Sequence, residues 1–191
     1  LVETIRAHRG IGVVDVDSDA VEKPGLTDPP PRRPQRAPDP PPDHAFAGAT
    51  YVACHSADQR DAVHALEALA EPGHAVVVEA DRGRGKSSAA GLAAANLAHQ
   101  GLDVLVTAPR YRSAGELFAR AAALLETLDV PVERDRVATP HRLTVAAGNG
   151  AEGRIRFEPP ASAVELPDEP DVVLVDEAAA LPVRRLEALL S

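Results

Sequence analysis

The chain of 191 residues has no methionine, no tryptophan and a single cysteine, Cys54. One cysteine excludes an internal disulfide bond and any metal site built from several cysteines. Aromatic residues make up only 3% of the chain, which argues against a nucleic-acid-binding surface built on base stacking. No apolar run approaches the roughly 18 residues that a membrane-spanning helix needs. We therefore expect no membrane partner and a cytoplasmic protein.

Lysine is also scarce, since Lys23 and Lys86 are accompanied by 18 arginines. The net charge of −9 does not favour non-specific attraction to phosphate backbones, so any contact with RNA or DNA must come from a local patch. An acidic, alanine-rich and lysine-poor composition is typical of a salt-adapted organism with a GC-rich genome. Because the chain does not begin with methionine and residues 1–10 do not resemble a signal peptide, we expect a truncated chain.

Proline divides the chain into three parts. Nine of the 18 prolines lie between Pro24 and Pro42, and such a stretch is typical of a semi-rigid linker. We therefore predict the end of a preceding domain over residues 1–23, a linker over 24–47 and one α/β domain over 48–191. Within the first part, residues 1–9 could be the end of a helix and residues 11–16 a short strand. The last helix of the α/β domain is short, which suggests a truncated C-terminal end as well.

The domain is predicted to alternate helices and strands. Short apolar runs over residues 75–80, 103–108 and 171–175 are typical of buried strands, and residues 141–146 and 154–158 are further candidates. Helices are expected after the capping boxes Ser56–Gln59 and Ser113–Glu116, over residues 87–99, and after Pro182. Apolar strands alternating with helices favour a parallel sheet covered on both faces.

A loop that could bind phosphate lies between the strand over 75–80 and the helix after it. Residues 80–88 read ADRGRGKSS. Gly83, Arg84 and Gly85 would let backbone N–H groups wrap a phosphate chain, while the Lys86 ammonium reaches its oxygens. The hydroxyl of Ser87 would bind Mg²⁺, and Ser88 completes the predicted nucleotide-binding set. The usual first glycine of this motif is replaced by Ala80.

Two adjacent carboxylates follow the strand over 171–175, in the string DVVLVDEAAALP. Asp176 would hold Mg²⁺, and Glu177 would orient and polarise the attacking water. The alternative is an acidic turn at a helix start. Because ligands of such sheets bind beyond the carboxyl ends of the strands, the two motifs together predict an ATP or GTP site. Lys86 and Glu177 are then the catalytic residues.

Two weaker signals accompany these motifs. The carboxamide of Gln59 could contact an adenine edge, although a capping role explains it equally well. Arg110 and Arg112 follow the strand over 103–108, where helicase-like ATPases contact the nucleic-acid backbone; an exposed basic loop is the alternative.

The segments ADRGRGKSSAAGLAA, VLVTAPR and VVLVDEAAALPVRRLEALL resemble the ATPase, helicase-like module of the tRNA(Met) cytidine acetyltransferases. In that family an alanine occupies the position of the usual first glycine, so Ala80 supports the resemblance. The likeness covers residues 56–191, and the composition favours a halophilic archaeon as the source.

The resemblance implies a P-loop NTPase (RecA-like) fold with Lys86 and Ser87 at phosphate and magnesium, Asp176 and Glu177 at magnesium and water, and Gln59 at the base. It implies that the complete enzyme uses acetyl-CoA and ATP or GTP hydrolysis to form N4-acetylcytidine at the wobble position of elongator tRNA-Met, with other RNA as a further candidate substrate. From the resemblance we expect the acetyltransferase domain to lie outside this chain. A general nucleic-acid helicase or AAA-type ATPase, and a non-catalytic nucleotide-binding or interaction module, are the alternatives.

Overall fold

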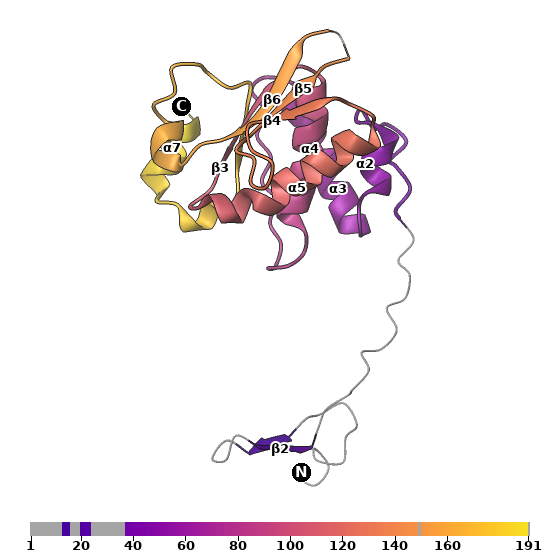
Figure 1. The fold of residues 1–191 in the computed structure, drawn as a ribbon, viewed down its shortest axis with the longest axis vertical. Coiled ribbons are helices and arrows are strands. Elements are labelled where there is room, and N and C mark those ends of the chain that lie inside the picture. Colours follow the sequence, from indigo (N-terminus) through magenta and orange to yellow (C-terminus); the bar gives the residue numbers. More distant parts are fainter. Residues whose placement is uncertain (1–12, 16–19, 24–36, 149, 191) are drawn as a thin grey trace. The chain divides into compact units, whose positions relative to one another are not determined.

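The computed structural model of the chain describes residues 13–15, 20–23, 37–148 and 150–190 (Figure 1). Backbone contacts divide the chain into two compact units, Leu1–Gln35 and Arg36–Ser191. The helix predicted over residues 1–9 lies outside the described residues, as do residues 24–36 of the predicted linker. The boundaries predicted for the preceding domain and the linker remain predictions.

The first unit contains two short strands. β1 (Val13–Asp15) pairs with β2 (Ala20–Lys23) in antiparallel register, with Val14 opposite Val21 and an irregularity between Val13 and Val14. β1 lies within the strand predicted over residues 11–16.

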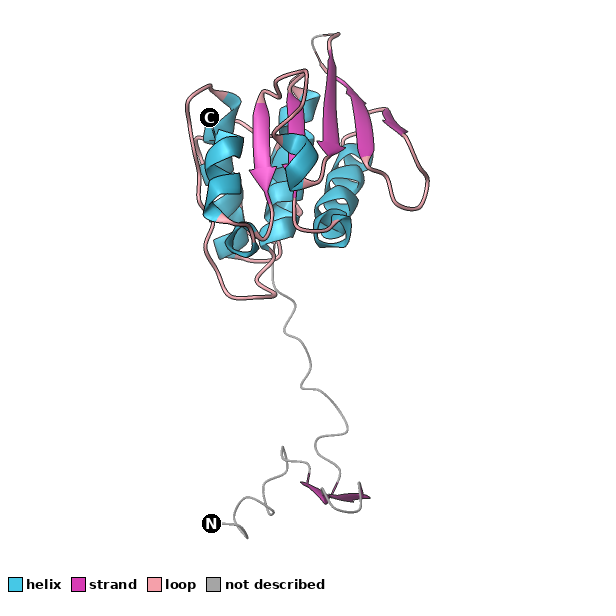
Figure 2. Ribbon diagram, turned by 90° about the vertical axis from the view of Figure 1, so that its left-hand side faces the viewer, coloured by secondary structure: helices cyan, strands magenta, loops and turns pink. Residues whose placement is uncertain are grey.

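The second unit is an α/β domain built around one five-stranded sheet (Figures 1 and 2). Its strands are β3 (Asp103–Thr107), β4 (Val132–Arg134), β5 (Arg142–Ala146), β6 (Glu152–Phe157) and β7 (Val172–Val175). Its helices are α2 (Gly48–Val52), α3 (Ala57–Leu66), α4 (Lys86–His99), α5 (Tyr111–Thr127), α6 (Pro160–Ala163) and α7 (Val183–Leu190), with the 3₁₀ turns η1 (Glu67–Ala70) and η2 (Ala178–Ala180).

The sheet is mixed, so the prediction of a wholly parallel sheet was wrong. Its order is β4-β5-β6-β3-β7, in which β3 runs parallel to β6 and β7 while β4, β5 and β6 pair antiparallel. Apolar content indicates that a strand is buried, but it carries no information on direction. The strands β5 and β6 are separated by a loop of only five residues, and so short a connection requires antiparallel pairing.

The strand predicted over residues 75–80 is absent, which is a second correction. These residues follow η1 without pairing to any strand in the described part of the chain. Val76 and Val78 pack against the core, but Val77 between them is 91% exposed. The alternation suits a strand locally, yet a strand also needs a neighbour to bind its N–H and C=O groups. The sequence pattern gives no information on whether a neighbouring strand is present.

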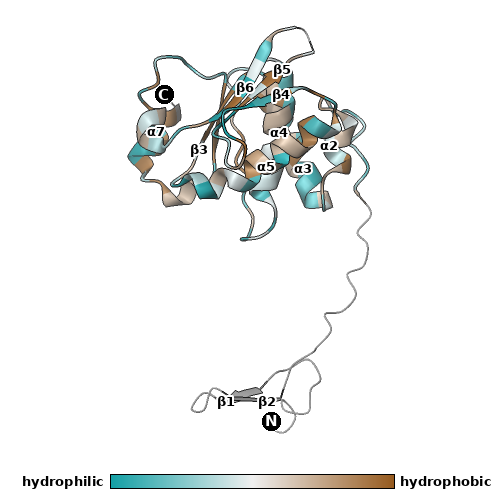
Figure 3. Ribbon diagram, viewed as in Figure 1, coloured by the Kyte–Doolittle hydropathy of each residue, from teal (hydrophilic) through white to brown (hydrophobic). Residues whose placement is uncertain are grey.

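The interior lies between the sheet and α4, which is nearly all alanine, glycine and leucine on its buried sides. β3 is brown in Figure 3, in keeping with the complete burial of Val104 and Val106. Small residues allow the backbones to approach closely: a Cβ on Gly153 of β6 would lie 1.9 Å from the Ala98 carbonyl oxygen of α4. Glycine at this position therefore sets the distance between helix and sheet.

A second close approach joins α4 to α5, which lie side by side (Figure 1). A Cβ on Gly91 of α4 would lie 2.4 Å from the Leu117 carbonyl oxygen of α5. Gly115 of α5, by contrast, has open space where its Cβ would be.

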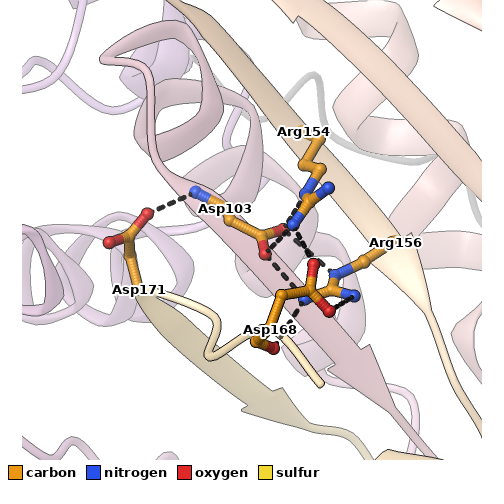
Figure 4. Close-up of polar contacts among 5 residues, drawn as sticks. All are labelled: Asp103, Arg154, Arg156, Asp168 and Asp171. Atoms are coloured by element: carbon orange, nitrogen blue, oxygen red, sulfur yellow. Dashed lines mark hydrogen bonds and ion pairs between the residues drawn. The ribbon is translucent and has the colours of Figure 1, made fainter. Parts of the chain in front are cut away.

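The other face of the sheet carries a partly buried ionic cluster (Figure 4). Arg156 on β6 is only 4% exposed and binds the carboxylates of Asp103 at 2.7 Å and Asp168 at 3.1 Å. Arg154 binds the same two carboxylates, and Asp171 accepts a hydrogen bond from the Asp103 N–H at 2.7 Å. Because Asp103 begins β3 and Asp168 lies in the loop before β7, the cluster fixes that loop over the sheet.

The two helical glycines give a matched test of the α4–α5 contact. We expect Gly91→Ala to lower the free energy of unfolding by about 2 kcal/mol, because the added methyl group must displace the α5 backbone. Gly115→Ala adds the same methyl group in open space. It should raise the free energy of unfolding by about 0.5–1 kcal/mol, because alanine has a higher helix propensity than glycine. Denaturant unfolding measures both, and equal effects of the two substitutions would contradict the described contact.

The ionic cluster predicts how stability depends on pH. Hydrogen bonds from Arg156 and Arg154 lower the pKa of Asp168. A carboxylate whose pKa is lower in the folded chain stabilises the fold above its unfolded pKa of about 3.9, and this contribution disappears as the pH falls through the folded pKa. Asp168→Asn should therefore be less stable than the wild type at pH 7, with the difference shrinking below about pH 4. Thermal unfolding across this range measures it, with Glu169→Gln in the same loop as the control; a difference independent of pH would refute the assignment.

Candidate functional site

The loop before α4 has the backbone that its glycines predict. Gly83 and Gly85 have positive φ values of 81° and 83°, which side chains other than glycine adopt at a cost. Gly85 directly precedes α4 and provides no side-chain cap, so the first N–H groups of this 14-residue helix have no side-chain acceptor. The positive end of the helix therefore faces the loop, in the arrangement that favours an anion.

Lys86 is the first residue of α4, and its side chain turns back toward the loop. Its ammonium donates hydrogen bonds to the carbonyl oxygens of Ala80 and, at 3.0 Å, Asp81. The charge is thus held at the mouth of the loop rather than in the hydrophobic core.

Gln59 joins this loop from α3. Its Nε2 donates to the Gly85 carbonyl oxygen at 3.3 Å, while its Oε1 accepts from the His55 N–H at 2.7 Å. Ser56 accepts from the Gln59 N–H at 3.2 Å, which confirms the first half of the predicted capping box. In a capping box the Gln59 side chain would accept from the Ser56 N–H. Here it accepts from the N–H of the preceding residue, His55, and also donates to Gly85 of the loop.

A pocket of about 410 Å³ lies between α3 and the loop. Its lining includes Gln59, Arg84, Gly85 and Lys86, four of the residues predicted to bind nucleotide. It also includes Asp58, Ala62, Val78, Glu79, Ala80, Asp81 and Ala89. Ser87 is half-buried beside it, and Ser88 is buried with no hydrogen-bond partner for its hydroxyl among the described residues.

Asp176 and Glu177 follow β7 directly. The Asp176 N–H donates to the Thr107 carbonyl oxygen at 2.9 Å, and its Oδ1 accepts from the Glu177 N–H at 2.9 Å. Its Oδ2 is buried and has no hydrogen-bond partner within the described ranges. An unpartnered carboxylate oxygen at a strand end suits a hard cation such as Mg²⁺.

The two halves of the predicted site, the loop before α4 and the carboxylates after β7, have different contacts. Gln59 and the loop residues share one pocket, whereas Asp176 and Glu177 contact Thr107 and Ser113. In the described part of the chain no hydrogen bond or ion pair links the two groups. No cluster of three or more His, Cys, Asp or Glu side chains there is placed to hold a metal ion.

Ser113 was predicted to cap the N-terminus of a helix, and the structure gives it another position. Its predicted capping box with Glu116 was wrong, because α5 begins two residues earlier at Tyr111 with Arg110 as its N-cap. Ser113 therefore lies inside the first turn, and its Oγ donates to the Glu177 Oε2 at 2.9 Å. Local spacing could not reveal this contact, because its partner is 64 residues away.

A second pocket, of about 370 Å³, lies at the same edge of the sheet beyond β6. Its lining comprises Asp135, Arg136, His141, Arg142, Arg156, Phe157, Glu158 and Pro159. The Tyr111 ring stacks on His141 with centroids 4.0 Å apart, and its hydroxyl donates to the Pro140 carbonyl oxygen at 2.5 Å. Arg110 and Arg112, on either side of Tyr111, are exposed.

Two ionisable groups near this second pocket, Asp135 and Tyr111, have shifted pKa values. Burial opposes the charge of Asp135, but N–H groups of Arg142 and His141 donate to its Oδ1 and lower its pKa. The Tyr111 pKa is raised, chiefly by burial. The ionised Asp135 carboxylate therefore holds the two ends of its loop together through these N–H groups, while Arg136 and Arg142 remain exposed.

None of the described helices is long and apolar enough to cross a bilayer. Residues 77–191 match the family model described as the helicase domain of RNA cytidine acetyltransferase NAT10/TcmA. The chain is 62% identical over 189 residues to a tRNA(Met) cytidine acetyltransferase TmcA of Haloarcula marismortui, which covers 99% of this chain and 24% of that protein. Proteins of the same name are 48% identical in Haloferax volcanii and 31% identical in Pyrococcus abyssi, each over 100% of this chain and about a quarter of their own length.

Proposed function

From the fact that the chain belongs to the RNA cytidine acetyltransferase NAT10/TcmA family and contains its helicase domain, we propose that it binds ATP or GTP with Mg²⁺ and hydrolyses it to act on RNA. The chain spans about a quarter of the length of the relatives that it matches. The complete protein would transfer an acetyl group from acetyl-CoA to cytidine in tRNA(Met), in the cytoplasm. Acetyl-CoA would bind outside the present chain.

One observation carries this proposal: the pocket between α3 and the loop gathers Gln59, Gly85 and Lys86 at the N-terminus of α4. The helix N–H groups and the Lys86 ammonium would bind the phosphates, and Gln59 would contact the base. This assignment includes a P-loop NTPase architecture for the domain, with β6, β3 and β7 as the parallel part of its sheet.

Asp176 and Glu177 would act at the phosphate end of the nucleotide. The unpartnered Asp176 Oδ2 and the Ser87 hydroxyl are oxygen ligands suited to Mg²⁺, which when bound would neutralise charge on the phosphates. The Glu177 carboxylate would accept a proton from the attacking water and orient it. The family membership excludes an unrelated helicase. A non-catalytic nucleotide-binding module would bind ATP without hydrolysing it, so the measurement of ATP turnover described for Glu177→Gln in the next subsection separates it from the proposed function.

Lys86→Ala should weaken binding of Mg²⁺-ATP at least about tenfold, because the substitution removes the positive charge nearest the phosphates. The melting temperature should change little, since the ammonium contacts loop carbonyl groups outside the core. Isothermal titration and thermal unfolding measure the two effects, and Lys23→Ala, which removes the other lysine, is the control. Unchanged affinity in Lys86→Ala, or no binding by the wild-type chain, would refute the nucleotide site.

The RNA contact is proposed at the exposed arginines around the second pocket. Arg110 and Arg112 flank Tyr111, whose ring stacks on His141, and Arg136 and Arg142 line the second pocket together with His141. They form a local concentration of positive groups on a chain with a net charge of −9. Each could neutralise one phosphate of an RNA strand.

Arg110→Ala combined with Arg112→Ala should reduce affinity for tRNA. The slope of log affinity against log salt should become shallower by about 0.7–0.9 for each lost phosphate contact. Filter binding or fluorescence anisotropy at several salt concentrations measures the slope. Arg184→Ala, which removes an exposed arginine of α7, should leave it unchanged; a double variant with the wild-type slope would place the RNA elsewhere.

A further inference from the structure

Glu177 has an unusual backbone for a glutamate. Its φ of 54° and ψ of 40° lie in the left-handed region, between the end of β7 and the turn η2. A non-glycine residue remains there only when surrounding contacts hold it, and such residues often occur at functional sites. The Asp176 Oδ1 holds the Glu177 N–H at 2.9 Å, which fixes the backbone but leaves the side chain with its own rotatable bonds.

Ser113 supplies the contact that holds the side chain. Its Oγ–H donates to the Glu177 Oε2 at 2.9 Å. The two residues meet because β3 and β7 are paired in parallel, with Thr107 opposite Val175. The chain leaves both strands at the same edge of the sheet, so the first turn of α5 lies beside the turn that follows β7.

The first turn of α5 is itself fixed on its other side. Tyr111, two residues before Ser113, donates a hydrogen bond to the Pro140 carbonyl oxygen and stacks on His141. Tyr111 also packs edge to face against Phe157 of β6. A hydroxyl group on a turn held in this way is a rigid donor, and a rigid donor restricts the carboxylate to a narrow range of positions.

We propose that Ser113 is a positioning residue for nucleotide hydrolysis, which holds the Glu177 carboxylate at the attacking water. This inference rests on the proposed function, because it needs Glu177 to act on that water. Ser113 does not line the pocket of Gln59 and Lys86, so it acts on the orientation of Glu177 and not on nucleotide binding.

The test compares Ser113→Ala, Ser113→Thr and Glu177→Gln in the full-length protein. Ser113→Ala frees the Glu177 side chain and should lower kcat for ATP hydrolysis about tenfold or more, since misplacing a reacting group by 1 Å can cost up to about a hundredfold. KM for ATP and the melting temperature should stay at their wild-type values. Ser113→Thr keeps the hydroxyl and should restore most of the turnover. Ser162→Ala, which removes an exposed hydroxyl of α6, is the matched control.

The outcomes separate this inference from the proposed function. Wild-type or faster turnover in Ser113→Ala, while Glu177→Gln is slow, would overturn the role of Ser113 alone. Equal losses in Ser113→Ala and Ser113→Thr, or a raised KM together with a lower melting temperature, would show a merely structural contact and also overturn it. Wild-type turnover in Glu177→Gln would refute the proposed role of Glu177 and, with it, that of Ser113.

Discussion

The parallel pairing of β3 with β6 on one side and with β7 on the other determines where the candidate functional residues that follow these strands lie. Parallel strands end at the same edge of a sheet, so the segments after Thr107, Phe157 and Val175 leave the sheet together. These segments carry the basic turn of α5, the lining of the second pocket and the adjacent carboxylates. The hydrogen bond from the Asp176 N–H to the Thr107 carbonyl oxygen extends the β3–β7 ladder by one step beyond the strand. The position of Asp176 is therefore a property of the sheet and not of a loop.

The helix α4 packs closely against one face of this sheet and against α5. The helix contains six alanines and a glycine between Lys86 and His99, and most of them are fully buried. Small side chains contribute little apolar area each, but they let the helix backbone approach β6 at Gly153 and α5 at Gly91. The same approach fixes the direction of α4 relative to the strands. Because Lys86 is the first residue of this helix, the position of the loop at its N-terminus depends on contacts made three turns further along.

The sequence was sufficient to predict elements whose determinants are local. The strands at 103–108, 141–146, 154–158 and 171–175 and the helices over 87–99 and after Pro182 are confirmed within one or two residues, because each has an apolar pattern bounded by its own end signals. Residues 75–80 have an equally clear pattern, but whether they form a strand depends on a partner elsewhere. Strand direction and the contact of Ser113 with Glu177 likewise depend on residues far along the chain. Composition and spacing therefore predicted which residues could form a site, whereas the grouping of Gln59 with the loop needed the structure.

Two aspartates at opposite ends of neighbouring parallel strands differ in how completely their carboxylate oxygens are bound. The Asp103 carboxylate, at the start of β3, accepts hydrogen bonds from Arg154 and Arg156, so both of its oxygens have partners. Burying a carboxylate is costly without such partners, and here two guanidinium groups offset the cost. Asp176, at the end of β7, has one oxygen bound and the other buried without a partner in the part of the chain that the structure describes. A buried carboxylate oxygen without a protein partner has room for one more ligand, which is the feature that the proposed Mg²⁺ site uses.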